Sequence, residues 1–127
     1  DRVQLSAAIP EPARKDLQDA QKCHSVGIHS ASAVLCGRAI ERIVRDKTGE
    51  MTIAKGLQKL LDDRIIDARL YAWADALRKE RNIAAHATDD EITAENARDL
   101  LDFAVAIYEY VYVLHDKYIE FCKRKNA

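Results

Sequence analysis

The stretch TAENARDLLDFAVAIYEYVYVLHDKYIEFC, residues 93–122, decides the fold class of this chain. Its apolar side chains recur at alternating spacings of four and three residues, which is the period of one face of an α-helix. The positions on this first stripe are Leu100, Ala104, Ile107, Val111, Leu114, Tyr118 and Phe121. Thr93 stands before the pattern, where its hydroxyl can cap the first helical turn. The pattern therefore predicts one long helix that begins after Thr93.

A second apolar stripe runs beside the first on the same predicted helix. Its positions are Leu101, Val105, Tyr108, Tyr112, His115, Ile119 and Cys122. Together the two stripes make the helix apolar over most of its girth through Val113. A single bundle does not need this much apolar surface on one helix. We therefore expect the surplus to form the interface of a homodimer along this long C-terminal helix.

Two further helices are predicted upstream. Pro12 suits the first position of a helix that ends near Val26, because its missing N–H costs nothing there, and residues 1–11 form an arm before it. Ser30 can cap a second helix, which Thr48-Gly49 closes. We expect both helices to turn an apolar stripe toward a common core.

A short helix and a fourth main helix complete the predicted set. Thr52 begins the short one, which ends near Asp62-Asp63, although Gly56 weakens its helical propensity. Asp67 caps the fourth helix. Its stripe is Leu70, Trp73, Leu77, Arg81 and Ala84. The sequence therefore predicts an all-α antiparallel bundle of four main helices plus a short helix, with residues 12–127 as a single domain.

Composition narrows the possible classes of protein. A length of 127 residues fits one domain, and 48% hydrophobic and 32% charged residues suit helices with apolar stripes. A net charge of −1 gives no broad attraction to nucleic acid or to a membrane surface. The three cysteines form no CxxC pair, which favours a reducing cytoplasmic setting and argues against a zinc cage.

Two expectations concern the surroundings of the domain. The most apolar stretch, residues 103–114, is interrupted by Glu109, so we do not expect it to span a membrane. The sequence begins with Asp1, so we expect the domain to belong to a longer protein with a fused upstream domain.

The segment Arg81-Asn82-Ile83-Ala84-Ala85-His86 is the candidate chemical site. His86 titrates near neutral pH and could act as a general acid or base, while the planar fork of Arg81 could bind a phosphate and Asn82 could orient groups by hydrogen bonds. Arg78 and Lys79 stand close by as candidate substrate-binding cations. This set needs no metal or cofactor, and it suits RNA, whose 2′-hydroxyl can attack the neighbouring phosphate.

The same residues also admit a purely structural interpretation. Arg81 can extend from the edge of the core, and His86 can interact with a helix C-terminus, where the dipole favours a cation. Arg38 and Glu41 likewise form either a solvated ion-pair face with Arg45 or a supporting pair beside the candidate site. The residue types and spacings leave both interpretations open.

The remaining histidines and acids have simpler explanations. His24 lies on an apolar stripe, so a hydrogen-bonded core histidine is expected there, and His115 is interpreted in the same way. The carboxylates of residues 89–91 are explained by the N-terminal approach to the long helix, so no metal site is expected around His86.

Three segments together resemble the DUF4145 family, one lineage of HEPN domains. They are Ile9-Pro10 leading into Ala13-Arg14-Lys15-Asp16-Leu17-Gln18-Asp19-Ala20, then Cys36-Gly37-Arg38-Ala39-Ile40-Glu41, and then Arg81-Asn82-Ile83-Ala84-Ala85-His86. The resemblance implies a helical bundle that dimerises and brings two copies of the last segment face to face across a cleft. It also implies metal-independent RNA cleavage, with Arg81, Asn82 and His86 as the site and Glu41 as a companion.

Two functions are compatible with these observations. The first is a homodimeric, metal-independent endoribonuclease in a bacterial defence or toxin-like system. The second is a non-catalytic dimerisation or ligand- and nucleotide-sensing module of a larger defence or restriction-associated protein, since a fold does not guarantee an activity.

Overall fold

The structure is a computed structural model that describes residues 4–80 and 92–126. These residues are almost entirely helical. The elements are α1 (Glu11–Ser25), α2 (His29–Thr48), α3 (Ile53–Asp62), α4 (Ala68–Lys79), α5 (Ala94–Tyr108), the π-helical segment η1 (Glu109–Leu114) and α6 (His115–Asn126). The all-α bundle of four main helices and one short helix is confirmed, with α5, η1 and α6 together forming the long C-terminal helix.

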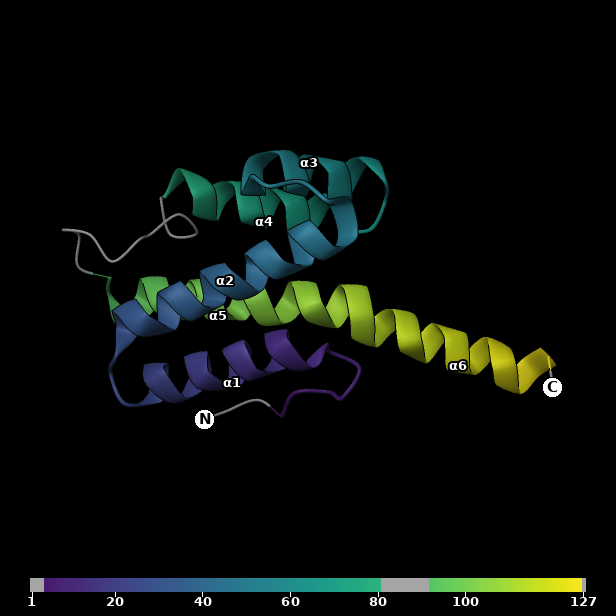
Figure 1. Cartoon of the computed structure of the whole chain (residues 1–127), viewed down its shortest axis with the longest axis horizontal. Helices are drawn as coiled ribbons and strands as arrows, with labels where there is room; N and C mark the ends of the chain where they lie inside the picture. Colours follow the sequence, from purple (N-terminus) through teal and green to yellow (C-terminus); the bar gives the residue numbers. More distant parts are fainter. Residues whose placement is uncertain (1–3, 81–91, 127) are drawn as a thin grey trace.

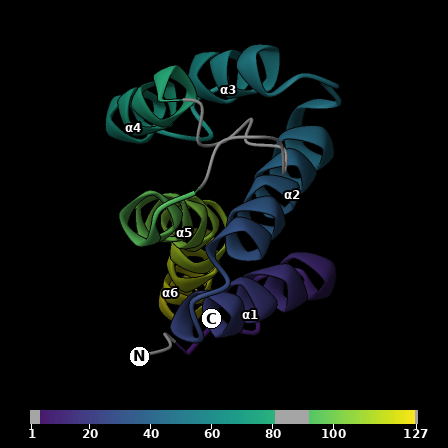
Figure 2. The same cartoon turned by 90° about the vertical axis from the view of Figure 1, so that its left-hand side faces the viewer.

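The helices lie in layers around a central pair. Helix α2 crosses α5, while α1 lies on one side of this pair and α3 with α4 on the other (Figures 1 and 2). Helix α2 packs against α1, α3 and α5, whereas α4 packs against α3 and α5. Helix α6 continues the line of α5 beyond the other helices (Figure 1). None of the described helices is both long and apolar enough to pass through a lipid bilayer.

Three of the four predicted N-caps are confirmed. The side chains of Thr52, Asp67 and Thr93 each accept a hydrogen bond from a backbone N–H in the first turn of the helix that follows. The prediction for Ser30 is wrong, because α2 already begins at His29 and Ile28 is its N-cap. The chain turns tightly after α1, where Gly27 adopts a φ of 83°. Helix α2 therefore begins one residue before Ser30, without a side-chain cap.

The core lies where α1, α2 and α5 meet. Its largest fully buried side chains include Leu17, Ile40, Ile43, Phe103 and Tyr108. The hydroxyl of Tyr108 donates a hydrogen bond of 2.6 Å to the carbonyl oxygen of Ala39, which joins α5 to α2. The phenol therefore packs in the core without leaving a polar atom unpaired.

Gly56 has a structural reason in the middle of α3. It is buried, and a Cβ atom built at this position would lie 3.1 Å from Cβ of Val44 and closer still to one of its methyl groups. The missing side chain thus permits the close contact between α2 and α3. This packing outweighs the low helical propensity that made Gly56 an uncertain helix residue.

The long C-terminal helix changes character along its length. The first four positions of its first stripe, Leu100, Ala104, Ile107 and Val111, are buried, but Leu114, Tyr118 and Phe121 are about half exposed. Helix α6 contains no buried residue, and within the described part of the chain it contacts only η1. The second stripe is buried as well at Leu101, Val105 and Tyr108, so the bundle itself covers most of the apolar girth predicted through Val113. The exposed apolar side chains lie beyond Val113, at the free end of the helix.

Candidate functional site

The candidate catalytic residues Arg81, Asn82 and His86 lie outside the described residues. The structure does describe the elements on either side of their segment. Helix α4 leads to it and ends at Lys79, and α5 follows it after the cap Thr93. The described part of the chain therefore reaches the segment from both sides.

At the end of α4, the two predicted substrate-binding residues Arg78 and Lys79 form ion pairs with the same carboxylate. Nη1 of Arg78 lies 3.2 Å from Oδ1 of Asp75, and Nζ of Lys79 lies 3.1 Å from Oδ2 of the same residue. The Lys79 side chain is 77% exposed and that of Arg78 is 35% exposed. Asp75 thus offsets part of the positive charge that would face an anionic ligand. Sequence reasoning missed Asp75, although its spacing of three and four residues from the two cations indicates such pairs.

Arg38 pairs with a carboxylate on another helix rather than with Glu41. Its Nη2 lies 2.9 Å from Oδ1 of Asp16 on α1, and its Nε lies 3.2 Å from Oδ2. Nε of Arg42 lies 3.0 Å from the same Oδ2. The predicted ion-pair face with Glu41 is therefore wrong as far as Arg38 is concerned, because its guanidinium reaches across to α1. Glu41 itself is exposed on α2.

Asp16 is the unexpected member of this cluster. Its side chain is only 6% exposed, and both oxygens accept hydrogen bonds from arginines. We call Asp16, Arg38 and Arg42 the arginine clamp. Buried carboxylates are rare unless they are paired. The position of Asp16 next to the apolar stripe of α1 was a signal that could have found it.

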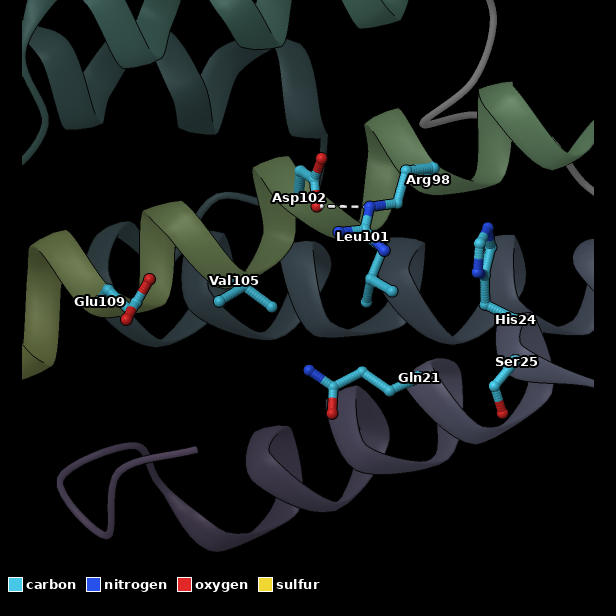
Figure 3. Close-up of a pocket in the computed structure, with 8 residues that line it drawn as sticks. All are labelled: Gln21, His24, Ser25, Arg98, Leu101, Asp102, Val105 and Glu109. Atoms are coloured by element: carbon cyan, nitrogen blue, oxygen red, sulfur yellow. Dashed lines mark ion pairs between the residues drawn. The ribbon is translucent and has the colours of Figure 1, made fainter. Parts of the chain in front are cut away.

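A cavity of about 230 Å³ lies between α1 and α5. Its lining consists of Gln21, His24, Ser25, Arg98, Leu101, Asp102, Val105 and Glu109, as drawn in Figure 3. At the rim, Nε of Arg98 forms an ion pair of 3.1 Å with Oδ1 of Asp102. The cavity therefore combines apolar side chains with hydrogen-bonding groups.

The two histidines beside this cavity differ in their hydrogen bonding. His24 is half-buried, and its Nε2 lies 3.2 Å from the carbonyl oxygen of Ala94 at the start of α5. The ring of His29 lies 5.1 Å from that of His24, and its buried Nδ1 has no hydrogen-bond partner among the described residues. The prediction of a hydrogen-bonded histidine thus holds for His24, whereas His115 is exposed rather than in the core.

A second, more open cavity of about 460 Å³ lies where α6 leaves the bundle. It is lined by Lys47, Arg64, Ile65, Tyr110, Val111, Leu114, His115 and Tyr118. Arg64 adopts a φ of 60° in the turn after α3, a conformation that is uncommon for a residue with a side chain. Leu114 and Tyr118 belong to the exposed apolar stripe, so this cavity forms part of the same surface.

The family model named "Domain of unknown function (DUF4145)" matches residues 18–125. The chain belongs to the DUF4145 family. No curated protein and no solved structure matches its sequence. The matched range of the DUF4145 domain includes residues 81–86 together with both flanking helices, while Asp16 precedes it.

The cysteines of this DUF4145 domain are free thiols. Burial raises the pKa of the Cys36 thiol to about 12, against a smaller opposite effect of its hydrogen bond with Ser32. Cys36 is therefore protonated at neutral pH and poorly suited to nucleophilic attack. In residues 4–80 and 92–126, histidines, cysteines and acids form no cluster of three or more that could hold a metal ion.

Proposed function

We propose that this DUF4145 domain is an endoribonuclease of the HEPN type that cleaves RNA as a homodimer without a metal ion. The observation that carries the proposal is the segment Arg81-Asn82-Ile83-Ala84-Ala85-His86, which supplies a cation, an amide and an imidazole within six residues. Its place between α4 and the capped start of α5 supports the proposal, because ordered helices on both sides can fix its two ends.

The proposed reaction is an internal attack within the RNA strand. His86 takes a proton from the 2′-hydroxyl or gives one to the leaving 5′-oxygen, and water makes the other of these two proton transfers. Arg81 balances the charge that develops on the phosphate. The new bond joins the 2′-oxygen to phosphorus as the bond to the 5′-oxygen breaks. The products are a 2′,3′-cyclic phosphate and a 5′-hydroxyl. Asn82 holds the reacting groups by hydrogen bonds, with Glu41 and Arg38 as more distant support.

The exposed apolar stripe at the free end of the long helix, which begins at the last residue of η1 and continues on α6, supports the dimeric part of the proposal. Leu114, Tyr118 and Phe121 are 54%, 61% and 48% exposed and share one helical face. Helix α6 extends beyond the bundle, and among the described elements it contacts only η1. A second copy of α6 would cover this face and stabilise the helix, and two-fold dimers pair identical surfaces in this way.

The test is incubation of RNA with the full chain in EDTA, followed by analysis of the fragment ends. We expect fragments that end in 2′,3′-cyclic phosphate, and we expect His86→Ala and Arg81→Ala each to reduce the rate at least tenfold. His115→Ala and Arg45→Ala are matched controls, because both residues are exposed and lie outside the proposed site. Full cleavage by both site variants would refute the assignment.

A second candidate function is a non-catalytic dimerisation or ligand-sensing module. The pairing of Asp75 with both Arg78 and Lys79 favours it, because these cations are then less available to a phosphate. The net charge of −1 favours it as well. A dimer that leaves RNA intact at high protein concentration would support this alternative over the nuclease.

The biological setting proposed for either function is a bacterial defence or toxin-like system in the cytoplasm, with a further domain fused upstream. The free thiols of Cys23, Cys36 and Cys122 are compatible with a reducing compartment. Expression in bacteria tests the toxin-like role: growth arrest by the wild type that His86→Ala relieves is the expected result.

A further inference from the structure

The cavity between α1 and α5 is lined by the amide of Gln21, which the described residues leave without a hydrogen bond. Gln21 is only 6% exposed, yet within the described part of the chain its amide forms no hydrogen bond. Its side chain lines the cavity and extends beneath Leu101 and Val105 (Figure 3). The polar atoms of this amide are open to the cavity, where water or a ligand can form hydrogen bonds with them.

The other lining groups limit the charge of such a ligand. Arg98 is already paired with Asp102, and Glu109 adds a negative charge at the opposite end of the cavity. A phosphate would meet no free arginine or lysine here. A neutral molecule with hydrogen-bond donors and acceptors fits this surface better. An amino group on this molecule could donate a hydrogen bond to a carboxylate of the cavity.

Shape and polarity limit the ligand further. A volume of about 230 Å³ is below the roughly 300–1,000 Å³ of pockets for drug-sized ligands, so one small ring system fits. Leu101 and Val105 offer an apolar surface to the face of a ring. If Nε2 of His24 donates to the Ala94 carbonyl, Nδ1 of the neutral ring is left as an acceptor.

We propose that this cavity binds a nucleobase that carries an exocyclic amino group beside a ring nitrogen, as adenine does. The amide of Gln21 matches this edge, since its oxygen accepts from the amino group while its nitrogen donates to the ring nitrogen. The base can belong to a free nucleoside or to a single-stranded RNA whose bases are unstacked. The proposal is independent of cleavage at Arg81 to His86.

Binding of adenosine and of inosine to the full chain tests the proposal by calorimetry. Inosine is a matched ligand, because a carbonyl replaces the 6-amino group and the adjacent ring nitrogen becomes a donor. We expect adenosine to bind at least tenfold more tightly than inosine, which corresponds to about 1.4 kcal/mol. Equal affinity for the two nucleosides, or no adenosine binding at its solubility limit, would overturn it.

Two protein variants on the same helix locate the binding site. Gln21→Leu should weaken adenosine binding at least tenfold, whereas Gln18→Leu should leave it unchanged, because Gln18 is exposed on α1. An NMR titration of the wild type does not depend on the folding of any variant. It should shift the side-chain amide of Gln21 and the methyl groups of Leu101 and Val105; shifts centred elsewhere would refute the site.

A short oligoadenylate distinguishes the two sources of the base. Tighter binding of the oligomer than of adenosine, with the same dependence on Gln21, identifies a strand of RNA as the ligand. Binding of adenosine alone identifies a free nucleoside. A cleavage-deficient His86→Ala protein that still binds adenosine supports the proposal whether or not the nuclease assignment is correct.

Discussion

At the residue scale, Asp16 shows how a charge can be placed in a helical core. Both of its oxygens accept hydrogen bonds from the two arginines of the arginine clamp, and the side chain is 6% exposed. The partners Arg38 and Arg42 keep 55% and 37% of their side-chain surface exposed. Removal of Asp16 would therefore leave two arginines that water can still reach, which limits the cost compared with a fully buried pair.

We expect Asp16→Ala to lower the free energy of unfolding by about 2 kcal/mol, the range of hydrogen bonds to charged groups. Asp19→Ala on the same helix is the control, because Asp19 forms an exposed pair of 3.8 Å with Lys15. Its expected cost is below about 0.5 kcal/mol. Urea unfolding followed by circular dichroism measures both values. Equal effects of the two substitutions would mean that the arginine clamp contributes little.

Asp75 controls how much positive charge the end of α4 offers. Asp75→Asn should release Arg78 and Lys79 while keeping the size of the side chain. If RNA is the ligand, we expect tighter binding and a steeper dependence on salt, with the slope of log K against log salt growing by about 0.7 for each new phosphate contact. Fluorescence anisotropy at several salt concentrations measures this slope. An unchanged slope would show that RNA does not reach this end of α4.

At the scale of elements, the start of α4 depends on the carboxylate of Asp67. Its pKa is lowered by the hydrogen bond that it accepts from the backbone N–H of Leu70, with Arg69 as a further cause. A folded-state pKa below the unfolded value stabilises the protein above the unfolded pKa. This stabilisation is lost as the pH falls through the folded pKa.

The matched variant for this effect is Asp67→Asn, which can still cap the helix but carries no charge. We expect the difference in melting temperature between the wild type and Asp67→Asn to favour the wild type near neutral pH. The advantage should shrink as the pH falls below the usual range of aspartate. Melting curves over this range check the prediction, which fails if the difference does not depend on pH.

A second prediction at this scale concerns the free end of the long helix. Tyr118→Ser combined with Phe121→Ser should convert the proposed dimer into a monomer, because both side chains belong to the exposed stripe of α6. Lys117→Ser combined with Glu120→Ser is the control on the polar positions of the same helix. Sedimentation velocity at several concentrations gives the mass. A wild type that is already monomeric would contradict the proposed interface.

At the scale of the whole molecule, the proposed functional surfaces lie on different parts of the bundle. The end of α4 and the start of α5 lie on the same side of the bundle, and α6 leaves the bundle on the other side (Figure 1). The arginine clamp and the cavity that contains Gln21 both involve α1. The proposed dimerisation and base binding therefore depend on different surfaces, so base binding can be removed by substitutions that leave the dimer in place.

The sequence by itself determined the helices and most of their caps. The period of the apolar residues predicted α1, α2, α4 and the long C-terminal helix, and the caps Thr52, Asp67 and Thr93 are confirmed. These features depend on residues three or four positions apart, so the chain specifies them locally. The matched family range supports the resemblance to DUF4145. The roles of Arg81, Asn82 and His86 stay predictions.

Only the tertiary structure decided which side chains meet across helices. It gave Arg38 a partner on α1 instead of Glu41, placed Gly56 against Val44, and left the amide of Gln21 facing a cavity. It also buried one end of the apolar stripe of the long helix and exposed the other. The physical reason is that such contacts depend on the rotation and crossing of two helices, whereas the apolar period of one helix fixes only the face that it buries.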